Sequence, residues 1–397
     1  MKILQVIPSV SPVRGGTSVA VLETVKALRC NGVDVEIATT NDDGDGVLDV
    51  PLNTLTEFEG VPVRFFSRFS PPIRALSEYI FSSDFTRWIW QNIEGYDLIE
   101  INSFFSYVCT LSAIASRQKK RPYIISPHGQ LSPWVINQKR LKKDIYAFLA
   151  ERNNLNRATA IHCMTKNEAE DVHNFSISSP TFTVPLGVYP PEILPNAKQA
   201  LHEKYSIPEN IPIILFLSRI HPKKRPDFLL QVLKELQNEQ DFHLILAGSG
   251  DKEYVDTVTN LVSSLSLSSQ ITLTGFITGK DKDLLLQGSD IFVLPSYGEN
   301  FGVAVAEAMA VGLPPIITPE VHICSDILAE NAGLVIPGEI QPWIEAIRKL
   351  LISPSLREEM GKNGKKLASE RYAWNNIGKN LATVYEAILE GNPLPKL

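Results

Sequence analysis

Short hydrophobic runs, each followed by a turn, occupy the first 40 residues. Residues 3–7 form an apolar run that ends at a proline, as expected of a buried strand. A loop with Gly15 and Gly16 follows, and apolar residues then recur at helical spacing up to Gly32. This helical face consists of Val21, Leu22, Val25 and Leu28. Alternating apolar residues at 33–37 predict the next strand, so the segment is typical of a β-α-β unit with parallel strands.

Further strands are predicted in both halves of the chain, and prolines separate the halves. In the first half they lie at residues 97–101 and 123–126, whereas residues 60–95, rich in aromatic residues and arginine, show no clear period. Six prolines fall between residues 185 and 212, which is typical of a linker followed by a new domain. The strands predicted after this linker are Ile213–Leu217, 244–247, 271–273, Ile291–Leu294, Pro315–Ile317 and 334–336. The predicted helices are one that starts at Pro226, those at 252–264, 280–287 and 302–311, and a helical tail from 341.

The length and the order of elements predict an α/β protein of two Rossmann-like domains. A chain of 397 residues is too long for one ordinary core. The predicted bounds are residues 1–190 for the first domain, 191–370 for the second and 371–397 for a C-terminal helix. Open α/β sheets bind ligands at the carboxyl ends of their strands, so we expect the functional residues in loops that follow strands and line a crevice between the two sheets.

Composition and charge narrow the classes of function. The formal net charge of −6 disfavours a general nucleic-acid binder, which carries a basic excess. The four cysteines form no CxxC pair, which excludes a zinc ribbon, gives no sign of a disulfide framework and indicates a reducing, cytoplasmic location. The sequence has no run of about 18 apolar residues, so no transmembrane helix is expected and any membrane contact would be peripheral, on the inner face.

Two glutamates eight positions apart form the most informative motif. Glu299 ends a strand-to-helix loop, and Glu307 lies two turns into the next helix, which is apolar nearly all round. The helix N-terminus at Phe301, Gly302 and Val303 offers free backbone N–H groups and a positive dipole end, which suits a phosphate. Beside a diphosphate there, one carboxylate would bind sugar hydroxyls and the other ribose hydroxyls. The alternative is a helix cap and an exposed charge, but a carboxylate in a buried helix is costly without a partner.

A basic loop follows the first strand of the second domain. Arg219 and Lys224 stand on this loop at the carboxyl end of the sheet. A nucleotide diphosphate that leaves during transfer gains negative charge, and where no metal ion neutralises it, fixed cations must do so. We therefore predict that Arg219 and Lys224 bind the diphosphate, while Lys223 and Arg225 face the solvent. Taken alone, the loop would also fit a solvated basic turn.

Three other loops at strand ends carry candidate ligand contacts. Gly248 and Gly250 end a strand and open a helix, which fits either a phosphate- or base-facing loop or a plain tight turn. Gly16 lets the chain approach a donor phosphate or the acceptor, but it is not in a GxGxxG fingerprint, so nicotinamide binding is disfavoured. His128 lies between a proline and a glycine at a strand end. It is expected to hydrogen-bond the donor sugar or support a positive anomeric centre, although a lone histidine is often structural.

Two charged segments lie outside these loops. Residues 41–46 contain a DxD pattern, which holds a divalent metal in other transferases, and they partly resemble a calcium loop. Position twelve of such a loop is Leu52 instead of glutamate, so we predict a flexible acidic turn without metal. The basic run at residues 139–143 lies near the start of an amphipathic helix. It is either a solvated face or a surface for anionic lipid or an acceptor diphosphate.

Together these segments resemble the family-4 retaining glycosyltransferases of GT-B fold. The spacing of Glu299 and Glu307 is similar to that family's E-x7-E signature, and the basic pair, the first glycine loop and the histidine all have counterparts in it. The tail from Tyr372 through Trp374 to Tyr385 resembles the final helix, which crosses back to the first domain. The resemblance covers nearly the whole chain and is strongest at residues 210–320.

The resemblance implies a UDP- or GDP-sugar donor, no metal ion or cofactor, and transfer with retention at the anomeric carbon. It places Glu307 on the ribose, Glu299 on the donor sugar and the basic pair on the diphosphate, with front-side departure and attack. Residues 318–327 depart from the family, which has a short glycine-containing turn and a glutamate there, and Asp326 stands in place of that glutamate. The acceptor would be a carbohydrate or a lipid-linked saccharide in polysaccharide or glycolipid assembly.

Two other functions fit the same architecture. A nucleotide-sugar 2-epimerase would need acid–base carboxylates in the first-domain part of the cleft, and the sequence shows none clearly. A non-catalytic nucleotide-sugar-binding protein would not need both glutamates, both cations and His128. Glycosyl transfer therefore explains more of the sequence than either alternative.

Overall fold

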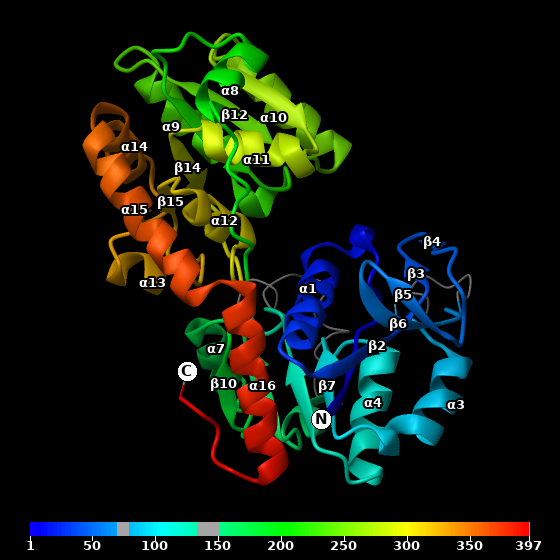
Figure 1. Ribbon diagram of the computed structural model, residues 1–397. Helices are drawn as coiled ribbons and strands as arrows, with labels where there is room; N and C mark the ends of the chain where they lie inside the picture. Colours follow the sequence, from blue (N-terminus) through cyan, green and yellow to red (C-terminus); the bar gives the residue numbers. More distant parts are fainter. Residues whose placement is uncertain (70–78, 133–150, 397) are drawn as a thin grey trace. The chain divides into compact units, whose positions relative to one another are not determined.

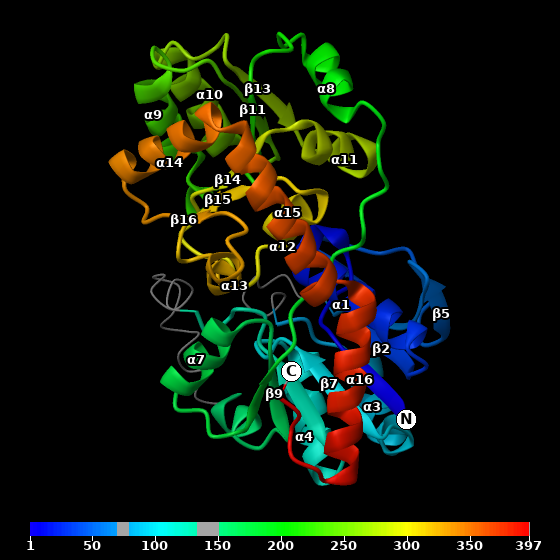
Figure 2. The same ribbon diagram turned by 60° about the vertical axis from the view of Figure 1, so that its left-hand side comes forward.

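The chain divides into two compact units, each with its own sheet (Figures 1 and 2). The computed structural model describes residues 1–69, 79–132 and 151–396. The first unit comprises Met1–Gly187 together with Trp374–Leu397, and the second comprises Val188–Ala373. Both are α/β folds with Rossmann-like parallel sheets, as the alternation of strands and helices along the sequence predicted.

The first unit is built on a sheet whose described strands lie in the order β10-β9-β8-β7-β1-β2-β6-β5. Neighbouring strands are parallel except β5 and β6. Its strands are β1 (Lys2–Val6), β2 (Asp34–Thr40), β5 (Leu55–Phe58), β6 (Val61–Phe66), β7 (Leu98–Asn102), β8 (Tyr123–Ser126), β9 (Ala160–Cys163) and β10 (Thr181–Thr183). A separate short hairpin consists of β3 (Asp42–Asp43) and β4 (Gly46–Val47). Because helices cover both faces, the central strands are buried on both sides and mostly apolar, although β1 carries Gln5 and β7 carries Glu100 and Asn102.

Helices cover the two faces of this sheet with different parts of the chain (Figure 1). The helices are α1 (Gly16–Cys30), α3 (Ser83–Asn92), α4 (Tyr107–Gln118), α7 (Lys166–Asn174) and α16 (Trp374–Glu390), with short 3-10 turns η1 (Pro12–Arg14) and η2 (Ile93–Gly95). The C-terminal helix α16 packs with α1 in one hydrophobic cluster, whereas α3 and α4 belong to the other. A Cβ at Gly378 of α16 would lie 2.4 Å from the Ala27 carbonyl oxygen, so only glycine permits this close approach to α1.

The second unit is built on a parallel sheet whose described strands lie in the order β13-β12-β11-β14-β15-β16. Its strands are β11 (Ile213–Leu217), β12 (His243–Ala247), β13 (Ile271–Gly275), β14 (Ile291–Leu294), β15 (Pro315–Ile317) and β16 (Leu334–Val335). Its helices are α8 (Ala197–Tyr205), α9 (Pro226–Leu236), α10 (Lys252–Ser264), α11 (Gly279–Gly288), α12 (Val303–Val311), α13 (Cys324–Ala329), α14 (Ile340–Ile352) and α15 (Pro354–Arg371). Helices α9, α10 and α14 pack together, as do α8, α11, α12 and α15.

Candidate functional site

The strand order of the second unit reverses between β11 and β14. The chain builds β12 and β13 on one side of β11 and β14 to β16 on the other. The loops after β11 and β14 therefore diverge at the carboxyl edge of the sheet, which is where open α/β sheets bind ligands. The two loops are joined, since the Tyr297 amide donates a hydrogen bond to the Lys223 carbonyl oxygen at 2.8 Å. This junction gathers most of the candidate residues of the second domain.

Lys224 and Glu299, one from each loop, form an ion pair. Lys224 ends the 3-10 turn η3 (Pro222–Lys224) and is only 8% exposed, and Glu299 is also mostly buried. Burial, together with the charges of Lys223 and Arg219, lowers the pKa of Lys224 to about 7. The ion pair with Glu299 works against this shift. Lys224, predicted to bind the diphosphate, and Glu299, predicted to bind the donor sugar, thus lie in direct contact.

The remaining residues of the basic loop differ in exposure. Arg219 is exposed, as a residue available to a ligand should be. Lys223 and Arg225, however, are half-buried, so the prediction that they face the solvent is wrong. The Arg225 guanidinium stacks 3.9 Å from the centre of the Phe228 ring and 4.4 Å from that of Tyr297, and it donates to the Gly338 carbonyl oxygen at 3.0 Å. Arg225 therefore holds the loop against the fold.

The loop before α12 presents its backbone instead of its side chains. Phe301 is 3% exposed and packs edge-to-face on Tyr372 with ring centres 5.2 Å apart. Gly302 then takes a left-handed conformation with φ 91°, and Val303, the first residue of α12, is exposed. The first amides of α12 have no acceptor within the helix, so they suit an anion. A Cβ at Gly302 would lie 3.8 Å from that of Glu299, which places this helix end beside the Lys224–Glu299 pair.

Glu307 has a partner on the neighbouring helix. Its carboxylate, half-buried in α12, accepts from Lys282 Nζ of α11 at 2.7 Å. The partner that a carboxylate in an apolar helix requires is therefore present, and it comes from a different helix.

Gly248 and Gly250 have a packing role at the same edge. A Cβ at Gly248 would lie 1.8 Å from the Ser218 carbonyl oxygen, and one at Gly250 would lie 1.9 Å from that of Ile220. The glycines thus let the loop after β12 pack on the backbone that carries Arg219. Their contact with a ligand stays a prediction.

Residues 318–327 lie against Glu299 through the backbone. The Glu299 amide donates to the Glu320 carbonyl oxygen at 2.9 Å, and the His322 amide donates to the Glu299 carbonyl oxygen at 3.1 Å. Asp326 instead accepts from the Tyr372 hydroxyl at 2.6 Å and pairs with Arg371 at 2.9 Å. Asp326 therefore ties the end of α15 to this segment.

In the first unit the strand order reverses between β1 and β7, and a cavity of about 230 Å³ opens near these strand ends. Its lining includes Ser9, Arg14, Thr17, Ser18, His128 and Gln130. Gly16 starts α1 next to this lining and is exposed, and a Cβ there would meet open space. The cavity combines hydroxyl, amide, imidazole and guanidinium groups, which suits a polyhydroxylated ligand.

His128 follows β8 with its backbone in the left-handed region, φ 51°. Its Nε2 lies 2.9 Å from Asn102 Oδ1. Burial and the nearby charge of His162 lower the pKa of His128 to about 4, although Glu100 acts in the opposite direction. The imidazole is therefore neutral at physiological pH.

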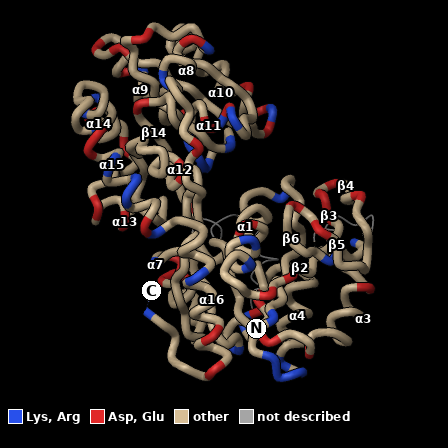
Figure 3. The backbone as a smooth tube through the Cα atoms, viewed as in Figure 1, with Lys and Arg blue, Asp and Glu red and all other residues tan. Residues whose placement is uncertain are grey.

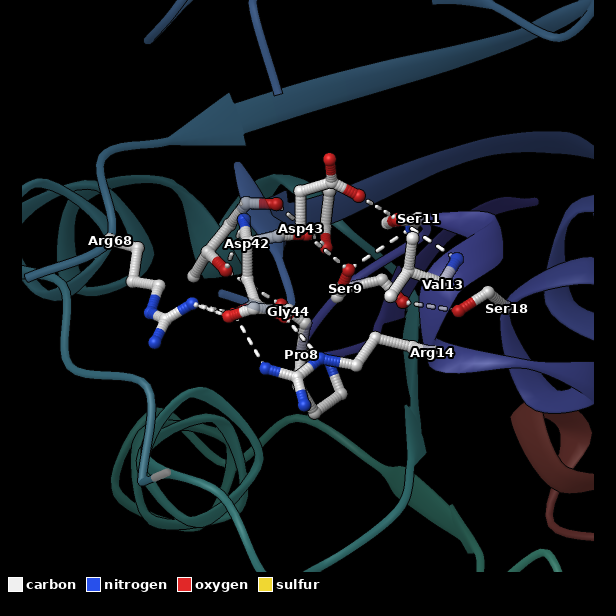
Figure 4. Close-up of polar contacts among 12 residues, drawn as sticks. Pro8, Ser9, Ser11, Val13, Arg14, Ser18, Asp42, Asp43, Gly44 and Arg68 are labelled. Atoms are coloured by element: carbon white, nitrogen blue, oxygen red, sulfur yellow. Dashed lines mark hydrogen bonds and ion pairs between the residues drawn. The ribbon is translucent and has the colours of Figure 1, made fainter. Parts of the chain in front are cut away.

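The segment at residues 41–46 is held by ion pairs of the buried Asp42, so its prediction as a flexible acidic turn is wrong (Figure 4). Asp42 is 0% exposed and accepts from Arg14 Nε at 2.5 Å and from the Arg68 guanidinium. Its neighbour Asp43 accepts from the Ser11 hydroxyl. Acidic positions gather on this hairpin in Figure 3. The described residues include no group of three or more histidines, cysteines or acids arranged to hold a metal ion.

Two family models match the chain, one in each unit. The model "Glycosyl transferases group 1" matches residues 197–367, and the model "Glycosyl transferase 4-like domain" matches residues 15–187. The two matched segments contain the candidate residues of both sheets. The chain belongs to the GT-B glycosyltransferases.

Three relatives of this glycosyltransferase are at most 29% identical to it. An uncharacterized glycosyltransferase of Methanocaldococcus jannaschii is 29% identical over 179 residues, and the match covers 45% of each protein, so it spans about half the relative's length. A D-inositol 3-phosphate glycosyltransferase of Xylanimonas cellulosilytica is 23% identical over 404 residues, 96% of this chain and 93% of the relative. The crystal structure of Anabaena HepE in complex with UDP and glucose has a TM-score of 0.78 at 21% identity, covering 98% of this chain and 100% of that one.

Sequence reasoning missed two polar residues of the glycosyltransferase's first unit, Arg14 and Asn102. Arg14 both lines the cavity and pairs with Asp42, and Asn102 bonds His128. Arg14 directly precedes the Gly15-Gly16 loop, so its position was a usable signal. The basic run at 139–143 lies outside the described residues. None of the described helices has the length and apolar content that a membrane span needs.

Proposed function

We propose that this glycosyltransferase moves a sugar from a UDP- or GDP-sugar to a hydroxyl acceptor, with retention at the anomeric carbon and without a metal ion. The observation that carries the proposal is the junction at the β11–β14 reversal. There Lys224 and Glu299 form an ion pair beside the N-terminus of α12, and Arg219 stands on the same loop as Lys224, close enough for its charge to act on that side chain. The Anabaena protein of the same fold was crystallised with UDP and glucose, which supports a nucleotide-sugar donor.

In this proposal the donor diphosphate binds the amides at the start of α12 and the cations Arg219 and Lys224. Glu299 then binds hydroxyls of the donor sugar, and Glu307 binds the ribose. The bond between the anomeric carbon and the diphosphate oxygen breaks, and the two cations stabilise the negative charge that develops. The acceptor oxygen attacks from the face that the diphosphate leaves, and its proton passes to the departing phosphate oxygen.

The first unit is proposed to bind the acceptor, a carbohydrate or lipid-linked saccharide, in its cavity of about 230 Å³. We further propose that the enzyme acts in the cytoplasm and that residues 139–143 contact the anionic inner face of a membrane, which flotation with anionic liposomes tests. Both matched models describe glycosyl transferases, which favours transfer over 2-epimerisation or non-catalytic binding.

A thermal-shift screen of UDP, GDP and their sugars tests the donor class. A ligand at 100 times its Kd stabilises the folded state by about 2.7 kcal/mol, so the correct donor should raise the unfolding temperature. Transfer with that donor should continue in EDTA, and proton NMR should show the donor's anomeric configuration in the product. Loss of turnover in EDTA would contradict metal independence, and an inverted product would contradict retention.

Glu307→Ala is expected to weaken UDP binding by about one to two orders of magnitude, because a hydrogen bond to a charged group is worth about 1.5–3 kcal/mol. Lys282→Ala is the matched control, since it removes the partner of Glu307 but keeps the carboxylate. Isothermal titration calorimetry should show a much smaller effect for this control. Equal losses in the two variants would mean that the ion pair supports the helix and that Glu307 does not bind ribose.

Donor affinity is expected to fall as pH rises above about 7. The pKa of Lys224 is about 7, and a bound diphosphate raises it, so above pH 7 binding requires proton uptake. The affinity for UDP-glucose, measured by calorimetry between pH 6 and 9, should be nearly level below pH 7 and fall by up to about tenfold per pH unit above it. Lys224→Arg keeps its charge throughout and should flatten the dependence. A steep slope in that variant would assign the proton to another group.

A further inference from the structure

A chain of buried polar side chains connects His128 with the interior of the first unit. It runs from Glu100 through Gln5 and Asn102 to the imidazole, and these three residues are 1–3% exposed. Polar groups this deep between apolar strands need a full set of hydrogen bonds. Because each hydrogen bond needs one donor and one acceptor, the partners of these groups also determine which atom carries each proton.

The inner end of the chain is an ionised pair. Glu100 accepts from His162 Nδ1 at 2.8 Å, from the Ser126 hydroxyl at 2.7 Å and from the Tyr385 hydroxyl of α16. The other nitrogen of His162, Nε2, faces the Val184 carbonyl oxygen at 2.9 Å. Both ring nitrogens of His162 therefore face acceptors, which requires an imidazolium.

The pKa shifts of the pair agree with this assignment. Burial alone would raise the pKa of Glu100, but the hydrogen bond and charge of His162 and the hydroxyls of Tyr385 and Ser126 lower it to about 2. Burial would likewise lower the pKa of His162, but the hydrogen bond and charge of Glu100 raise it. Glu100 is thus a carboxylate, which only accepts hydrogen bonds.

The Glu100 carboxylate determines which atom donates and which accepts in each hydrogen bond between Glu100 and His128. Gln5 must turn its Nε2 toward Glu100 Oε2, at 2.8 Å, so its Oε1 is left to accept. Asn102 donates to that oxygen from Nδ2 at 2.7 Å, and the same Nδ2 lies 3.4 Å from the Val6 carbonyl oxygen. Asn102 Oδ1 is therefore the atom that faces His128 Nε2, and that nitrogen must carry the proton.

We propose that Glu100, acting through the positioning residues Gln5 and Asn102, fixes His128 as the Nε2–H tautomer so that Nδ1 accepts a hydrogen bond from a substrate hydroxyl. The second half of this statement rests on the proposed function, since it assumes a sugar ligand in the cavity that His128 lines. A neutral His128 cannot offer two N–H groups, so its role at a sugar is that of an acceptor.

The charged groups around His128 come from several elements. Glu100 lies on β7 and His162 on β9, while Arg14 lines the same cavity. Glu168 of α7 accepts from the Gly129 amide at 2.6 Å. The low pKa of His128, about 4, means that the imidazole is neutral at physiological pH.

The test is NMR of the intact chain labelled with 13C and 15N in the histidine rings, with His128→Gln and His162→Gln spectra for assignment. At pH 7 His128 should show one protonated nitrogen, Nε2, and His162 should show two. His128 should not titrate between pH 5.5 and 8.5. A protonated Nδ1 on His128, or an even mixture of tautomers, would overturn the proposal.

Two variants test whether the Glu100 carboxylate determines which ring nitrogen of His128 carries the proton. In Glu100→Gln the new amide can donate or accept, so His128 should show both tautomers. Tyr385→Phe is the control: it keeps the Glu100 carboxylate, so His128 should show the Nε2–H form alone. Gln5→Met retains the Glu100–His162 pair while cutting the connection to Asn102, and it should also produce both forms. A pure Nε2–H form in both Glu100→Gln and Gln5→Met would show that the tautomer is set elsewhere.

Transfer assays on the same proteins separate this inference from the proposed function. If Nδ1 accepts from a substrate hydroxyl, kcat/KM in Gln5→Met should fall in proportion to the Nδ1–H fraction seen by NMR. Unchanged kcat/KM with a mixed tautomer would refute the role of Nδ1 at substrate. A wild-type chain without transfer activity would count against the proposed function, while its spectrum would still decide the tautomer.

Discussion

Arg219→Ala is expected to lower kcat/KM for transfer by about 10²–10³ while leaving the fold intact. The side chain is exposed on the loop after β11, so its removal leaves no cavity and no buried partner unpaired. What it removes is a fixed positive charge where the departing diphosphate gains negative charge, and the loss of one such preorganised group typically costs that factor. The effect should fall mainly on kcat, because the charge on the diphosphate is greatest in the transition state.

Steady-state kinetics with the donor identified by the thermal-shift screen measures this effect. Arg348→Ala is the control, since Arg348 is also a partly exposed arginine of the second unit, paired with Glu239 at 2.5 Å. It should keep wild-type kinetics, and both variants should unfold at the wild-type temperature. Undiminished turnover in Arg219→Ala would remove this residue from the diphosphate site.

Glu100→Leu is expected to destabilise the first unit by about 3–5 kcal/mol. Loss of one partner from a buried ion pair leaves the other without compensation, here His162, and the Tyr385 and Ser126 hydroxyls also lose their acceptor. Urea unfolding followed by fluorescence should show the loss as a lower midpoint. Glu94→Ala breaks the surface pair with Lys119 of the same unit and should leave that midpoint unchanged.

The Glu100/His162 double replacement by leucine should recover part of this loss, because it removes both charges together. The pair also gives a pH signature in the wild type. The pKa of Glu100 is lowered to about 2, so its stabilisation is complete above the unfolded-state value near 4.3 and disappears as pH falls toward 2. An acid limb of stability that persists unchanged in Glu100→Leu would assign acid unfolding to other carboxylates.

The strands and helices of the second half were largely predictable, because short apolar runs and helical spacing alternate there with clear turns. The elements within residues 60–95, which include β6 and α3, could not be predicted. In β6, Val61, Val63 and Phe65 are buried on one face as a strand should have them, but Pro62 and Arg64 interrupt the apolar run. Arg64 is kept there by stacking on Trp88 of α3, a contact that no local pattern shows.

The positions of Glu299, Arg219 and Lys224 in strand-end loops were predictable from the strand pattern, and their contact with a donor stays a prediction. A residue's contacts were not predictable where the partner is distant in the chain. Asp42 appeared to be part of an open acidic turn because its partners, Arg14 and Arg68, lie 28 and 26 residues away on either side.

The first unit combines two separate segments of the chain, which constrains how it folds during synthesis. Its hydrophobic core is completed by Trp374, Leu381 and Tyr385 of α16, a helix that follows the whole second unit in the chain. The ribosome must add all of Val188–Ala373 first, which takes about 10–40 s at 5–20 residues per second. During that time the apolar face of α1 lacks its cover, so we expect the nascent chain to be a client for a chaperone until α16 has been made.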